Sequence, residues 1–89
     1  MTQQKIITLE IAGKELQFEP TEAAYNDYMN ELLPDNKVAP ANNFLFSVVT
    51  DESKEPLREI TKSNAGAAVQ ITSVVLAEFT PQMEIKVKK

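Results

Sequence analysis

The chain has 89 residues with 9 basic and 13 acidic side chains, a net charge of −4, and neither cysteine nor histidine. This length corresponds to one domain, and the missing residue types exclude disulfides, cysteine nucleophiles and the usual zinc sites. The acidic balance counts against binding to the nucleic-acid backbone, so residues 1–89 are expected to form a single small acidic domain.

No export or membrane segment is expected. Residues 1–5 carry no basic segment followed by a long apolar run, as a signal peptide would. No apolar stretch approaches the roughly 20 residues that cross a bilayer. The sequence therefore predicts a cytoplasmic protein without membrane contact.

Two strands are predicted near the N-terminus, because residues 5–11 and 15–19 alternate between apolar and polar side chains. The apolar positions are Ile7, Leu9, Ile11, Leu16 and Phe18. A type II′ turn at Gly13 and Lys14 is expected to join the strands as a hairpin. This turn places Ile11 opposite Leu16. It also places Leu9 opposite Phe18, so that both apolar stripes fall on one face.

A first helix is predicted from Glu22 to Leu33, because Thr21 suits the N-cap and Pro34 disfavours helical dihedrals in the residue before it. Its apolar stripe consists of Tyr25, Tyr28, Met29 and Leu32. The two tyrosines either pack on the hairpin or belong to a binding surface, and packing is the more frequent use of such a stripe.

A second helix is predicted from Pro40 to Thr50, since proline fits the first turn of a helix. Its apolar positions at helical spacing are Ala41, Phe44, Leu45, Val48 and Val49. Phe46 falls off this stripe and is expected to be exposed. It is either a contact point for a partner or an ordinary exposed apolar side chain.

A third helix is predicted from Ser53 or Lys54 to Lys62, with Ser53 as its N-cap. Its buried stripe is expected to consist of Leu57, Ile60 and Thr61. On the solvated face, Glu55 is expected to pair with Arg58 and Glu59 with Lys62, three residues apart.

A fourth helix is predicted from Ala67 to Phe79, after a left-handed residue at Asn64 or Gly66. The many β-branched side chains of this segment make a strand the alternative. More than ten residues without a turn signal favour the helix.

The C-terminal segment alternates again, with Met83, Ile85 and Val87 between polar residues, which predicts a short third strand. The predicted fold class is therefore α+β. An N-terminal β-hairpin and a short C-terminal strand form a three-stranded antiparallel sheet, which packs against a bundle of three to four short helices.

Groups that could carry out catalysis are scarce. The serines lie in no nucleophile-elbow motif, and two glycines, Gly13 and Gly66, cannot build a glycine-rich phosphate loop. The carboxylates fall at solvated positions where nothing raises a pKa. The sequence predicts a protein that is not an enzyme and has no cofactor and no metal site.

Several segments resemble one family. They are residues 25–28 (Tyr-Asn-Asp-Tyr), residues 36–45, residues 57–58, residues 65–68 and the closing residues 83–89. Over nearly its whole length the chain resembles the small tail assembly chaperones of phages and prophages. Residues 36–45 are the most specific part of the resemblance.

This resemblance implies a non-enzymatic assembly factor that works in the bacterial cytoplasm and is absent from the mature virion. It implies binding to the tape-measure protein, and to tail-tube subunits, by placing a partner helix in an apolar groove. The residues chosen for such a groove are Tyr25, Tyr28, Asn36, Lys37, Val38, Pro40, Asn42, Phe44 and Phe46. Self-association is also expected to help so small a domain.

Two other functions stay open. The chain would be an acidic inhibitor or decoy of a host factor if its acidic groups formed one face, although interleaved charges of both signs count against this. It would be a minor structural tail or connector subunit if it remained in finished particles.

Overall fold

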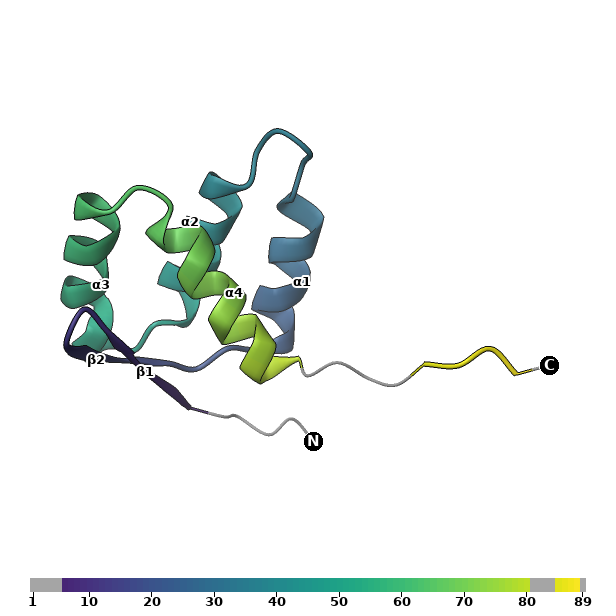
Figure 1. Cartoon of the computed structure of the whole chain (residues 1–89), viewed down its shortest axis with the longest axis horizontal. Coiled ribbons are helices and arrows are strands. Elements are labelled where there is room, and N and C mark those ends of the chain that lie inside the picture. The colour runs from purple at the N-terminus through teal and green to yellow at the C-terminus, as the bar shows by residue number, and fades with distance from the viewer. Residues whose placement is uncertain (1–5, 81–84, 89) are drawn as a thin grey trace.

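The computed structural model describes residues 6–80 and 85–88 of the chain. The elements are β1 (Ile7–Ile11), β2 (Lys14–Phe18), α1 (Glu22–Glu31), α2 (Val38–Val48), α3 (Asp51–Ser63) and α4 (Ala67–Phe79). The two strands form an antiparallel hairpin, and the helices lie to one side of it (Figure 1). The fold is therefore α+β, as predicted.

The hairpin register differs by two residues from the expected one. Ala12 and Gly13 form the turn, with φ of +52° and +82°, as a type I′ turn requires. Leu9 lies opposite Leu16, and Ile7 opposite Phe18. The predicted type II′ turn is wrong because it would have left Ile7 opposite Pro20, beyond the second strand. A shift of two residues keeps every apolar side chain on the same face.

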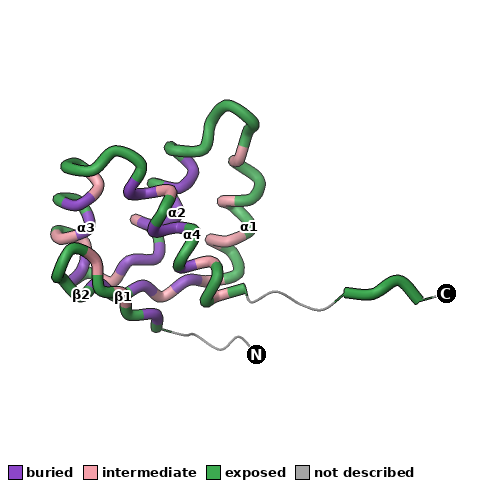
Figure 2. Tube along the Cα trace, in the orientation of Figure 1, coloured by how far each residue is buried: buried purple, intermediate pink, exposed green. Residues whose placement is uncertain are grey.

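The core lies between the hairpin and the helices, where Figure 2 shows the buried parts of the chain turned toward one another. Six core side chains are fully buried, with 0% exposure: Leu16, Phe18, Ala41, Leu45, Leu57 and Val75. They come from β2, α2, α3 and α4. α2, α3 and α4 therefore each contribute fully buried residues, whereas α1 contributes only the partly buried Ala24 and Tyr28.

The outer edge of β2 is covered by the connection between α2 and α3. The Gln17 N–H donates to Ser53 Oγ (2.8 Å), and the Thr50 N–H donates to the Gln17 carbonyl (3.0 Å). The Glu19 N–H donates to the Val48 carbonyl (2.8 Å). The prediction that Ser53 is the N-cap of the third helix is therefore wrong, because Thr50 takes that position. The buried Ser53 hydroxyl instead accepts a hydrogen bond from β2, a strand distant in sequence.

The other helix predictions are close to the structure. The fourth helix is confirmed, and Gly66 takes the left-handed conformation before it, with φ of +82°. The first helix ends at Glu31, two residues early, and the second begins at Val38. Glu55 pairs with Arg58 as expected, but Glu59 pairs with Lys14 in the hairpin (3.2 Å).

The expected third strand is not confirmed. It falls partly outside the described residues, and residues 85–88 form no strand and pair with neither β1 nor β2. They lie beyond the end of α4, away from the hairpin (Figure 1), with Ile85 79% and Val87 85% exposed. Within one chain, α4 carries residues 85–88 away from the edge of β1, so they do not pair with their own hairpin (Figure 1).

Candidate partner-binding surface

α1 is held against α2 and the end of α4 by ring contacts. The Tyr28 ring lies 5.4 Å from the Phe44 ring, and the Tyr25 ring lies 6.4 Å from the Phe79 ring, measured between centroids. The Thr21 hydroxyl caps the helix by accepting from the Ala24 N–H (3.1 Å). Both tyrosines are half-buried, and the prediction that they pack on the hairpin is wrong, because they pack on α2 and α4.

A groove of about 380 Å³ runs between α1 and α2. Its lining consists of Thr21, Ala24, Asp27, Tyr28, Glu31, Asn43, Phe44 and Ser47. Tyr28 and Phe44 supply the apolar part, and Asp27 and Glu31 supply two exposed carboxylates. Burial raises the pKa of the Tyr28 hydroxyl, so this group stays neutral through the physiological range. The groove therefore combines an aromatic wall with negative charge.

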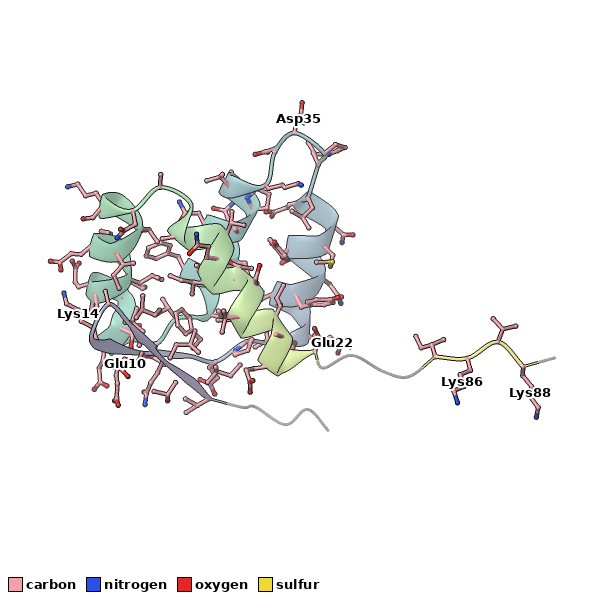
Figure 3. The ribbon with its side chains drawn as sticks, in the orientation of Figure 1. Glu10, Lys14, Glu22, Asp35, Lys86 and Lys88 are labelled. Atoms are coloured by element: carbon pink, nitrogen blue, oxygen red, sulfur yellow. The ribbon has the colours of Figure 1, made fainter. Side chains whose placement is uncertain are left out.

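Three large apolar side chains are exposed around the connection between α1 and α2. They are Met29 (40%), Leu33 (54%) and Val38 (60%). The connection is a tight turn in which Leu33 and Asn36 exchange two backbone hydrogen bonds (3.3 and 3.1 Å). Asp35 lies at its tip (Figure 3). We call the groove and these three residues together the α1–α2 surface.

Three of the nine predicted site residues, Tyr28, Val38 and Phe44, belong to this surface. Asn36, Lys37, Val38 and Asn42 are exposed, whereas Pro40 and Phe44 are buried. Phe46 lies apart from them and is half-buried, because the Arg58 guanidinium of α3 covers its ring at 5.8 Å from the centroid. The expectation that Phe46 is exposed is therefore wrong.

Sequence reasoning missed Met29 and Leu33 as surface residues, since their helical spacing assigned them to a packed stripe or a helix end. The signal was the proline after Leu33, which ends the helix and turns the chain outward. The α1 segment and its connection are also mainly acidic. Residues 22–37 contain four acidic residues, Glu22, Asp27, Glu31 and Asp35, and one basic residue, Lys37. Such a surface complements a partner with apolar and basic side chains.

In the described part of the chain, no group of three or more histidine, cysteine, aspartate or glutamate side chains is placed to hold a metal ion. None of the helices described is long and apolar enough to cross a membrane. One surface that the structure offers for recognition is the groove between α1 and α2.

Comparison with known proteins identifies the family of this domain. A family model described as phage tail assembly chaperone matches residues 7–89. The chain therefore belongs to the phage tail assembly chaperone family, and the resemblance found in its sequence is confirmed.

Two individual proteins are also similar. The chain is 37% identical over 82 residues to an "uncharacterized 11.3 kDa protein in lys 3′ region" of Haemophilus phage HP1 (strain HP1c1), covering 92% of this chain and 79% of that protein. The structure of an uncharacterised protein, rbstp2171, from Bacillus stearothermophilus superposes with a TM-score of 0.74 and 20% identity, over 97% of this chain and 90% of that one. The second likeness concerns the fold alone.

Proposed function

We propose that this chain binds the tape-measure protein during tail assembly and keeps it soluble, using the α1–α2 surface. Membership of the tail assembly chaperone family supports the role in assembly. The observation that carries the choice of surface is the exposure of Met29, Leu33 and Val38 beside the groove. The same proposal holds that the chain works in the host cytoplasm and is absent from the finished virion.

The recognition would follow the helix-in-groove mode, in which an amphipathic helix lays its apolar stripe against an apolar groove. Each of the three exposed side chains would contribute about 1–2 kcal/mol on becoming buried, since part of each is already covered. Basic residues beside the partner's stripe would lie near Asp27 and Glu31. These charges would speed the encounter and fix the orientation more than they would raise affinity.

α1 is the element that would move to admit a whole helix. It contributes no buried residue, and its ring contacts, Tyr28 with Phe44 and Tyr25 with Phe79, are worth about 0.5–1.5 kcal/mol each beyond their buried area. Displacing α1 would expose Phe44 to the partner. The partner's apolar side chains would then replace the lost ring contacts and offset part of the cost of opening.

The test is co-expression with the tape-measure protein of the same phage or prophage. We expect the tape-measure protein to move from the pellet to the soluble fraction and to co-purify with this chain. Val38→Asp and Leu33→Asp should each reduce co-purification about tenfold, because a charge cannot enter an apolar contact without a partner. Val74→Asp is the matched control, since Val74 is also exposed (48%) but lies on α4.

Unchanged solubility without co-purification would reject this function. Two results would then favour the other candidates. Recovery of the chain in purified particles would indicate a structural tail or connector subunit, and binding to a host factor would indicate a decoy. Binding to tail-tube subunits is tested in the same way by exchanging the co-expressed protein.

A further inference from the structure

The outer edge of β1 has unused backbone hydrogen-bonding groups. Gln17 directs its N–H and carbonyl away from β1, toward Ser53 and Thr50, so the pair that Gln17 makes with Thr8 is not hydrogen-bonded. By the same alternation, Thr8 and Glu10 direct their backbone groups outward. Within residues 6–80 and 85–88, no backbone hydrogen bond joins Thr8 or Glu10 to another element. This edge is able to accept a further strand.

An apolar groove runs beside this edge, between β1 and α4. One part of about 210 Å³ is lined by Leu9, Glu10, Ile11, Gln70, Ile71 and Val74. A second hollow of about 300 Å³ lies next to the first and shares Ile11, Gln70 and Ile71 with it. Val74 is 48% exposed, and Leu9 and Ile11 are half-buried. A strand added to β1 would cover these side chains on one of its faces.

The other face of such a strand would meet carboxylates. Glu10 lies directly opposite Glu15 on the solvent side of the hairpin, and like charges at opposite positions destabilise a sheet. In the part of the chain that the structure describes, neither carboxylate has an ion-pair partner. A strand at this edge is therefore favoured if it is apolar on one face and basic on the other.

Residues 85–88 have this pattern. Ile85 and Val87 alternate with Lys86 and Lys88, and both lysine side chains point to the same side of the segment (Figure 3). Ile85 and Val87 are among the most exposed large apolar side chains of the described residues. In the structure this segment lies beyond the end of α4, far from the turn of its own hairpin (Figure 1).

We propose that residues 85–88 of a second copy of this chain add to the edge of β1 as a third strand. Ile85 and Val87 would enter the groove of the other copy, and Lys86 and Lys88 would lie beside its Glu10. Exchange in both directions gives a two-fold symmetric dimer in which each copy contributes one edge and one segment. This proposal does not depend on the tape-measure protein.

The first experiment is sedimentation of the full chain over a range of concentrations. We expect a monomer–dimer equilibrium that Ile85→Asp and Val87→Asp each weaken by about tenfold or more. Thermal unfolding of the diluted monomer should not change, because these side chains make little contact with its core. Val74→Asp should weaken the dimer in the same way. Val38→Asp is the matched control, because Val38 lies outside the groove between β1 and α4.

The absence of cysteine allows a second experiment that identifies the pairing. Glu10→Cys protein is mixed with Lys86→Cys protein, or with Lys88→Cys protein to sample the neighbouring register, and oxidised. We expect a mixed disulfide of two-chain mass containing one copy of each variant. A monomer at every soluble concentration, or a dimer unaffected by the segment substitutions, overturns the proposal. So does a Glu10→Cys/Lys86→Cys double variant that closes its disulfide only within one chain.

Discussion

Leu16 and Phe18 of β2 are completely buried between helices, whereas α1, described from end to end, has no residue buried to that degree. β2 is bonded on one side to β1 and on the other to the α2–α3 connection. α1 is attached through the half-buried side chains of Ala24 and Tyr28 and through the ring contacts Tyr28–Phe44 and Tyr25–Phe79. One region is therefore fixed by fully buried side chains, and the other packs through half-buried ones. Elements of low local stability are those that move on binding.

The largest expected effect concerns the packed region. Phe18→Ala should lower the free energy of unfolding by about 3–5 kcal/mol, because it removes a fully buried ring and leaves a cavity. Denaturant unfolding followed by circular dichroism measures this loss. If the free energy of unfolding falls by less than about 1 kcal/mol, the side chains around Phe18 are not closely packed and the contrast with α1 is lost.

A matched pair of hydroxyl deletions sharpens the comparison. Ser53 and Thr21 each accept a hydrogen bond from a backbone N–H, but Ser53 is buried and Thr21 is half-exposed. Ser53→Ala should cost about 1–3 kcal/mol of global stability, since the Gln17 N–H loses its partner away from water. Thr21→Ala should cost about 0.5–1 kcal/mol and act mainly on α1. Equal losses in chemical denaturation would contradict the proposed difference between the regions.

Loss of a ring contact tests the attachment of α1. Tyr28→Ala should accelerate hydrogen exchange of the α1 amides about tenfold, since it removes the contact with Phe44. The amides of β2 should exchange as before. Mass spectrometry of the peptides provides the measurement, and equal acceleration in β2 would mean that α1 and the centre unfold together.

The smallest effect is a dependence on pH. Burial raises the pKa of Tyr28 above its usual value of 10.0. Stability should therefore be unaffected below pH 10.0 and should fall as the pH rises above it, because the unfolded chain ionises first. Tyr28→Phe should lessen this decrease in alkaline unfolding experiments. Tyr25→Phe retains Tyr28 and is the control; an identical decrease in both variants would contradict the prediction.

The elements themselves followed from local patterns. Alternation predicted both strands of the hairpin, and length with spacing predicted α4 to the residue. The register was not predictable in this way, because two registers that differ by two residues place the same side chains inward. Ser53 and Phe46 were placed wrongly because each is covered by an element distant in sequence: β2 covers Ser53, and Arg58 of α3 covers Phe46.

Only part of the α1–α2 surface was predicted, because its exposure also depends on how elements distant in sequence pack. The exposed residues of the connection between α1 and α2 follow from Pro34 and the polar residues after it, Asp35, Asn36 and Lys37. Met29 and Leu33 could not be assigned to it from their spacing, since an apolar stripe does not reveal how much of it the neighbouring helix covers. α2 covers Tyr28 and leaves Met29 exposed, which is a property of how the helices pack.

The covered edge of β2 has a consequence for colloidal behaviour. An uncovered edge is a template on which β-structure grows from chain to chain. Here the backbone groups of Gln17 and Glu19 are occupied by Ser53, Thr50 and Val48 of the same chain. A sheet that begins at this hairpin can therefore be extended in one direction alone. Repeated stacking of hairpins into fibrils is therefore blocked on the side of β2.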